Sequence, residues 1–274
     1  MRRYPLAIAI SIVFLSVFVA SQDSAHPQPD DSLRAAPAPP RYEPPSPTAT
    51  SSELEASGDQ LRAEKAYGDA IDYYRAALAK TRAKPAQAQL CNKAGIAELQ
   101  MMHFRDAEKD FERSIKRQHA YAEAHNNLGA TYYLEKKYAK AIEEYQQALQ
   151  LQDNDASFHN NLATAYFMLK EYPQAMSEYR RAFQIDPMVF DHSSQTGVSA
   201  RLSTPGNRAM FSYWMAKIYA QTGDFDRSIL YLRRAMEDGY KEIDNVYKDQ
   251  EFSSLRKDPR FTELMAAKPV AIPE

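Results

Sequence analysis

The chain has 274 residues, with 34 Lys and Arg against 36 Asp and Glu, and it carries one Cys. A single Cys excludes an intramolecular disulfide, so stability must come from packing. The near-neutral charge argues against a nucleic-acid-binding protein, which normally presents a basic stripe. We therefore expect no nucleic-acid partner.

The N-terminus reads as an export signal. Arg2 and Arg3 precede an apolar run over residues 6–20, and fairly small residues follow at its end. The run is shorter than the ~20 residues that span a bilayer comfortably, which is the layout of a cleaved signal peptide. We predict a signal peptide over residues 1–21, with an uncleaved N-terminal anchor as the alternative. Either outcome predicts an exported protein, periplasmic or secreted. It contacts a membrane only through this segment, which tethers it to the inner membrane if uncleaved.

A proline-rich segment follows the signal. Eight of the 16 prolines lie between residues 21 and 50, in a stretch without glycine and with few large apolar residues. Such a segment cannot bury enough surface to offset the entropy of ordering itself. We predict a disordered linker over residues 22–50, either a spacer that holds the folded part away from the N-terminus or a tail with no role beyond tethering or export.

Beyond residue 50 the sequence repeats with a period of 34. Ala107, Ala141 and Ala175 are spaced by 34, and an aromatic residue follows each of them four residues later. Upstream, the tripeptide at 127–129 (Asn-Leu-Gly) recurs at 161–163 as Asn-Leu-Ala. Small residues let two helices approach closely, and aromatic residues fill the space beside them. One such hairpin cannot bury its apolar face alone, so neighbouring hairpins must stack.

This pattern resembles the tetratricopeptide repeat, in which small and aromatic residues stand at set offsets. The resemblance implies an all-α fold, a right-handed α-solenoid of about five helical hairpins. Glu98 departs from the pattern, because a tyrosine is usual at its position. The predicted array covers residues 51–242, with a loop insertion at 190–208. Its repeats span 51–84, 88–121, 122–155, 156–189 and 209–242.

Residues 243–274 are predicted to form C-terminal capping helices. Asp258 before Pro259 is a favourable helix start. Phe261, Leu264 and Met265 then make an apolar face at helical spacing. Similar tails follow terminal tetratricopeptide repeats in many bacterial proteins, so the resemblance implies a cap on the end of the array.

The resemblance also implies a binding groove, because the first helix of each repeat lines the concave face in this family. Stacked asparagines, each with a donor and an acceptor, can hydrogen-bond the backbone of an extended peptide. For Asn126, Asn127, Asn160 and Asn161, a packing role is the alternative. Trp214 is either an exposed binding anchor or packs under the insertion. The candidate groove residues are Asn92, Lys93, Asn126, Asn127, Tyr133, Asn160, Asn161, Phe167, Tyr213 and Trp214.

Some members of the family bind C-terminal carboxylates through a clamp of lysines, asparagines and an arginine. The equivalent positions in the first three repeats hold Glu55, Asp59, Lys93, Glu123 and Asn127. Acids where cations are needed argue against such a clamp here.

Other chemistry is weakly represented. His125 and His159 stand at equivalent repeat positions, but no second pair of ligands accompanies them, so we interpret them as core histidines. Residues 153–155 begin like a calcium loop but lack its glycine and distal glutamate, which favours a turn. Cys91 is interpreted as a packing residue. The sequence shows no catalytic motif, which favours a non-enzyme without cofactor or metal.

The sequence thus favours a non-enzymatic scaffold of the cell envelope or the secreted fraction. Its expected partner is another protein, held as an extended peptide or a helix in the groove. The alternative is a structural or assembly subunit of an envelope or secretion complex that docks through the convex face or the insertion.

Overall fold

The computed structural model describes residues 43–190, 204–267 and 269. The predicted signal peptide, most of the predicted linker and most of the predicted insertion lie outside these residues. Within the described ranges all regular elements are helical and there is no strand. None of the described helices has both the length and the apolar character needed to cross a membrane.

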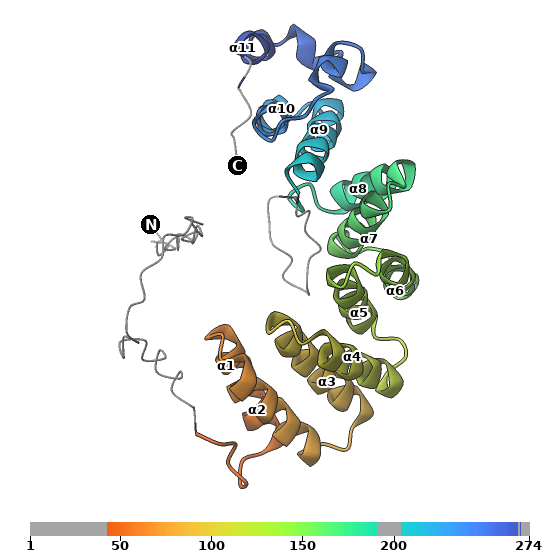
Figure 1. Ribbon diagram of the computed structural model, residues 1–274. Coiled ribbons are helices and arrows are strands. Elements are labelled where there is room, and N and C mark those ends of the chain that lie inside the picture. The colour runs from red at the N-terminus through yellow and green to blue at the C-terminus, as the bar shows by residue number, and fades with distance from the viewer. Residues whose placement is uncertain (1–42, 191–203, 268, 270–274) are drawn as a thin grey trace, which may run out of the picture. The chain divides into compact units, whose positions relative to one another are not determined.

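The first ten helices form successive pairs along the chain (Figure 1). Each pair corresponds to one predicted repeat. We call the five repeats units 1 to 5 and count positions in a unit from the first residue of its predicted repeat. The predicted all-α array of helical hairpins is therefore confirmed. The pairs are α1 (Ser51–Ala63) with α2 (Tyr67–Lys80), α3 (Lys84–Gln100) with α4 (Phe104–Arg117), α5 (Ala122–Leu134) with α6 (Tyr138–Leu151), α7 (Ala156–Met168) with α8 (Tyr172–Ile185), and α9 (Pro205–Thr222) with α10 (Phe225–Glu237).

The turn inside each unit has the same backbone geometry. Its central residue adopts a positive φ, which lets the chain leave the first helix sharply. This residue is not glycine in units 1 to 4, where φ is 64° at Lys65, 62° at Met102, 62° at Lys136 and 63° at Lys170. In unit 5 it is Gly223, with φ of 82°. The sequence period therefore also fixes the turn.

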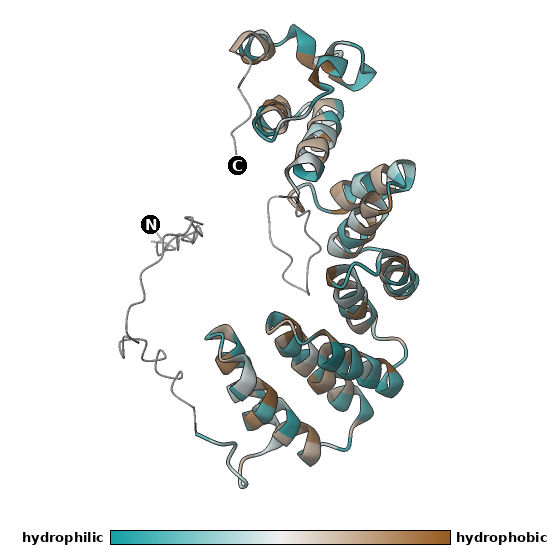
Figure 2. Cartoon of the chain, in the orientation of Figure 1, coloured by the Kyte–Doolittle hydropathy of each residue, from teal (hydrophilic) through white to brown (hydrophobic). Residues whose placement is uncertain are grey.

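Within a unit, a glycine on the first helix faces an aromatic ring on the second. A Cβ added at Gly129 would lie 2.7 Å from the ring of Tyr145, and Gly95 meets Phe111 at the same distance. The glycine is needed here because the ring fills the space that a side chain would take. Hydrophobic and hydrophilic residues both occur along the helices (Figure 2), as expected for helices that bury one face.

Successive units pack through the second helix of one and the first helix of the next. The pairs α2 with α3, α4 with α5, and α6 with α7 approach closely, whereas the backbones of α8 and α9 approach each other far less. Large aromatic side chains fill the wider junction between units 4 and 5. The ring centroids of Tyr179 and Phe211 are 5.3 Å apart, and those of Phe183 and Tyr219 are 5.2 Å apart.

The tail after unit 5 is mostly short 3-10 helices: η1 (Ile243–Tyr247), η2 (Gln250–Phe252) and η3 (Leu255–Lys257), followed by α11 (Pro259–Ala267). Asp258 precedes α11 and its Oδ1 accepts from the Arg260 backbone N–H at 2.9 Å, as the predicted helix start requires. The tail buries apolar side chains in the same core as α9 and α10: Val246, Phe252, Leu255, Phe261, Leu264 and Met265.

Three boundaries differ from the predicted ones. α3 begins at Lys84, ahead of the predicted repeat 88–121. α9 begins at Pro205, inside the predicted insertion, because Thr204 caps it by accepting from the Asn207 N–H at 3.3 Å. The end of the predicted linker contacts α2, where Tyr73 donates to the Glu43 carbonyl at 3.0 Å. Lys80 also donates to the Pro47 carbonyl at 2.7 Å. Residues 43–50 are therefore attached to unit 1.

Candidate functional site

Asparagine side chains join the first helices of units 2, 3 and 4. Asn127 Nδ2 donates to Asn92 Oδ1 at 3.0 Å, and Asn161 Nδ2 donates to Asn126 Oδ1 at 2.9 Å. Each bond links the sixth residue of one unit to the fifth residue of the unit before it. All four side chains are buried, with at most 5% of their surface exposed. We call these two hydrogen bonds the asparagine seam.

The seam differs from the open groove expected for these asparagines. A buried amide needs a partner, and here an amide of the adjacent unit supplies it. The packing role that was the alternative for Asn126, Asn127 and Asn161 is the one the structure shows, and it extends to Asn92. Contact of these four with another protein stays a prediction.

Lys93 is the sixth residue of unit 2 and pairs with unit 1 in the same way. Its Nζ lies 2.6 Å from Glu55 Oε1 and 2.6 Å from Asp59 Oδ2. Burial disfavours the charge, but the hydrogen bonds to both carboxylates outweigh it and raise the pKa of Lys93. Because Lys93 is already paired with two acids of its own chain, it is poorly suited to bind a partner's C-terminal carboxylate in a clamp.

The seam stops at Asn160, the fifth residue of unit 4. Its side chain is half-buried, and no described residue hydrogen-bonds to it. Trp214 stands at the sixth position of unit 5, but its ring packs against Phe167 at 5.2 Å and Tyr172 at 5.4 Å. The half-buried Trp214 therefore lies against unit 4, farther along α7 than Asn160. Packing of Trp214 under the insertion involves residues that lie mostly outside the described ranges, and its role as a binding anchor stays a prediction.

Tyr213, predicted to line the groove, is instead covered by the tail. Tyr240 stacks on its ring at 4.5 Å, and its hydroxyl donates to Asp249 Oδ2 at 2.8 Å. Lys217 Nζ also lies 2.9 Å from Asp249 Oδ2. Burial works to raise the pKa of Asp249, but the hydrogen bonds from Lys217 and Tyr213 outweigh it and lower the pKa. The prediction missed this because Asp249 lies outside the repeats.

Tyr133 and Phe167, also predicted to line the groove, are core residues. Tyr133 is 6% exposed with its ring 5.4 Å from that of Tyr138, and Phe167 is 2% exposed. Side chains one turn before the seam stay accessible to a partner. These are the exposed Gln89 and the half-buried Glu123 and Ser157, which join Asn160 on this face. We call this surface the first-helix face.

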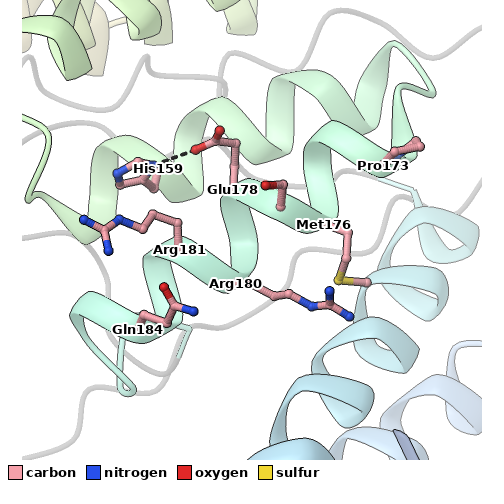
Figure 3. Close-up of a pocket in the computed structure, with 8 residues that line it drawn as sticks. His159, Pro173, Met176, Glu178, Arg180, Arg181 and Gln184 are labelled. Atoms are coloured by element: carbon pink, nitrogen blue, oxygen red, sulfur yellow. Dashed lines mark hydrogen bonds and ion pairs between the residues drawn. The ribbon is translucent and has the colours of Figure 1, made fainter. Parts of the chain in front are cut away.

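A second surface is a pocket of about 560 Å³ along α8 (Figure 3). His159 closes one side, with Nδ1 2.6 Å from Glu178 Oε2 and Nε2 3.0 Å from the Asp153 carbonyl oxygen. Both ring nitrogens therefore lie beside oxygen atoms of the chain. The lining residues are His159, Pro173, Met176, Ser177, Glu178, Arg180, Arg181 and Gln184.

The histidines, residues 153–155 and Cys91 were the other residues considered for metal binding or reactivity. His125 pairs with Glu144 at 2.8 Å, as His159 does with Glu178. No cluster of metal-ligating side chains is found among the described residues. Asp155 caps α7 by accepting from the Ser157 N–H at 2.8 Å, so residues 153–155 form the predicted turn. Cys91 is buried, and this burial raises the pKa of its thiol.

The fold and the seam define a class of protein, a stacked array of helical hairpins. Family models identify the repeats of this array. A TPR repeat model matches residues 131–170, and tetratricopeptide repeat models match residues 156–188 and 211–237. The chain therefore contains tetratricopeptide repeats, as the 34-residue period indicated. Comparison with curated proteins gave no match.

Solved structures with a related arrangement include one titled "Crystal structure of MamA". It is 19% identical, covers 68% of this chain and 95% of its own, and has a TM-score of 0.46. "MamA 41-end from Desulfovibrio magneticus RS-1" is 13% identical, with coverage of 68% and 93% and a TM-score of 0.48. "First TPR of Spaghetti (RPAP3) bound to HSP90 peptide SRMEEVD" is 22% identical, with coverage of 44% and 94% and a TM-score of 0.41.

Proposed function

We propose that the chain is a non-enzymatic scaffold that binds an extended segment or a helix of another protein on its first-helix face. Stacked helical repeats present long continuous surfaces for partners. The observation that carries the proposal is the seam, which joins the first helices of units 2 to 4 through buried amides. A surface preformed in this way loses little conformational entropy when a partner binds.

The polar character of the face suits an extended partner. Gln89, Glu123, Ser157 and Asn160 offer hydrogen-bonding groups at related positions of successive units. Side-chain amides and hydroxyls can bind a backbone without reading its sequence, and each bond contributes ~0.5–1.5 kcal/mol. Affinity then depends on several units acting together.

We also propose that residues 1–21 direct export and that residues 22–50 form a spacer. The contacts of Glu43 and Pro47 with α2 support a spacer that ends at a fixed point on unit 1. The mass of the mature chain from its native host tests the first part. A mature N-terminus at Gln22 is expected, whereas an intact Met1 in a soluble fraction would contradict export.

Docking through the second helices is the competing function, and the pocket on α8 favours it. Arg180 and Arg181 both line this pocket. Arg180 lies 3.8 Å from Glu251 of the tail, a long ion pair, so much of its charge is available to an acidic partner. This makes the α8 pocket the natural contact point for an assembly role.

Photo-cross-linking in the native host separates the two functions. A benzophenone amino acid is placed singly at Gln89, Glu123 or Ser157 of the first-helix face, and at Glu143 or Gln184 of the second helices. Mass spectrometry identifies what is captured. The proposal expects one protein to be captured from all three first-helix positions and not from Glu143. Capture from Gln184 alone would support the assembly role, and capture from none of these positions would contradict both.

A further inference from the structure

We propose that Asn160 and Trp214 form a peptide-binding subsite at the junction of units 4 and 5. Its ligand is an extended segment of a partner protein. A backbone N–H of this segment binds Asn160 Oδ1, and an apolar side chain three residues away packs against Trp214. The inference rests on the proposed function, and it names the contact point and the ligand chemistry.

The seam shows which chemistry Asn160 is suited to. At the fifth position of units 2 and 3, Oδ1 of Asn92 and of Asn126 accepts from an amide N–H at 3.0 and 2.9 Å. Asn160 is the same residue type at the same position, and no described residue supplies it with an amide. A peptide N–H is chemically the same donor, and the Asn160 side-chain N–H groups can bind a peptide carbonyl in return.

The position of α9 explains why Asn160 is left open. Trp214 contacts Phe167, the twelfth residue of unit 4, whereas the equivalent Asn161 contacts Asn126, the fifth residue of unit 3. Asn207 Nδ2 also lies 3.5 Å from Met168 Sδ, near the C-terminal end of α7. α9 is therefore displaced along α7, and the residue that continues the seam in earlier units lies away from Asn160.

The spacing of the two residues suits an extended chain. Asn160 and Phe167 are seven residues apart on α7, which at 1.5 Å per residue is roughly 10 Å. An extended chain rises ~3.3 Å per residue, so roughly three residues cover this distance. Between them, Thr164 is 3% exposed, and its hydroxyl already bonds to the Asn160 carbonyl at 2.8 Å and lies 3.1 Å from the Tyr179 hydroxyl. Because the Thr164 hydroxyl is already paired, it does not compete with Asn160 for the peptide.

Trp214 supplies the apolar contact. Its ring is held edge-on by Phe167 and Tyr172, yet the residue is only half-buried, so part of the ring stays accessible. Tryptophan fixed by packing is the residue type that most often dominates binding energy at protein interfaces. A fixed ring at one end and an amide at the other define the direction and spacing of the ligand.

The test uses a defined probe, a phage-displayed library of linear 12-residue peptides panned against the full chain. The affinity of one selected peptide is then measured by calorimetry for the chain and its variants. Asn160→Ala should weaken binding about fivefold, the equivalent of one hydrogen bond. Asn160→Asp, which keeps the acceptor, should bind more tightly than Asn160→Ala, and Trp214→Leu should weaken binding at least tenfold.

Matched controls separate this subsite from the function on which it rests. Gln184→Ala removes an amide from the α8 pocket and should leave affinity unchanged. Peptides that are indifferent to Asn160→Ala and Trp214→Leu but are lost with Gln89→Arg and Glu123→Arg would overturn the subsite and keep first-helix binding. Peptides that are lost only with Gln184→Ala, or a library that yields no peptide, would overturn both. Unchanged melting of Asn160→Ala confirms that any loss of affinity is local.

Discussion

The junctions among units 1 to 4 and the junction between units 4 and 5 are built from different chemistry. Within the first set, helices approach closely and polar pairs such as Asn127 with Asn92 connect the sixth position of one unit to the fifth position of the unit before it. At the second, the helices stand apart and rings such as Phe183 and Tyr219 fill the space. Directional hydrogen bonds fix a register, whereas apolar contacts fill volume and tolerate displacement.

This difference decides which polar groups remain for a partner. A seam asparagine is satisfied by the next unit and is buried, so its hydrogen-bonding capacity is used inside the fold. Where the aromatic junction displaces α9, Asn160 keeps its capacity. The proposed binding subsite therefore lies at the junction where the repeat pattern breaks.

The largest effect is expected from removing a ring at the aromatic junction. Phe183→Ala should lower the free energy of unfolding by about 3–5 kcal/mol, because Phe183 is 9% exposed and packs against Tyr219. Leu149→Ala is the matched change at the same position of unit 3, where the side chain is only partly buried, and should cost about 2 kcal/mol. Urea unfolding measures both, and a larger loss for Leu149→Ala would contradict the comparison.

Breaking the seam should have the next largest effect. Asn127→Ala removes the donor to the buried Asn92 Oδ1, so we expect a loss of about 1–3 kcal/mol in unfolding free energy. Asn160→Ala removes the same atoms from a half-buried residue without a described partner and should change stability by less than about 0.5 kcal/mol. Equal losses in the two variants would show that Asn160 is paired as the others are.

Two equivalent tyrosines test how closely the units resemble each other. The Tyr145 hydroxyl is buried and has no hydrogen-bond partner among the described residues, whereas the hydroxyl of Tyr179 lies 3.1 Å from that of Thr164. Tyr145→Phe should therefore keep or raise the unfolding free energy, by up to about 1 kcal/mol, and Tyr179→Phe should lower it by about 1 kcal/mol. Thermal denaturation of both variants checks the sign, and a loss in Tyr145→Phe would contradict the packing described.

The smallest effect concerns the tail and acid. The folded state lowers the pKa of Asp249, so its pairing with Lys217 and Tyr213 stabilises the chain above the unfolded carboxylate pKa of about 3.9 and is lost as pH falls through the lower folded value. Because 28% of the Asp249 side chain is exposed and solvent screens the pair, the contribution is below about 1 kcal/mol. Between pH 6 and pH 3, the wild type should lose more stability than Asp249→Asn. An equal loss in both would show that this pairing contributes nothing.

Features formed within a single unit could be predicted from the sequence, whereas several contacts between units, or between a unit and the tail, could not. The 34-residue period locates the helix pairs, and the small residues predict close approach, as Gly129 against Tyr145 shows. The burial of Asn92 was not predicted, because it depends on how far the next unit is shifted. The available signal was the opposite charge of Glu55 and Lys93, which stand at the fifth position of unit 1 and the sixth position of unit 2. The covering of Tyr213 depends on Asp249, 36 residues away and outside the repeats.

Hydrogen exchange of asparagine side-chain amides, followed by NMR on the full chain, tests the central claim most directly. We expect slow exchange for Asn127 and Asn161, whose side-chain amides donate inside the seam, and fast exchange for Asn160. Exchange at Asn160 should slow when a bound peptide is added, while the seam amides stay as they were. Protection of Asn160 in the free chain equal to that of Asn127 would contradict an open end to the seam.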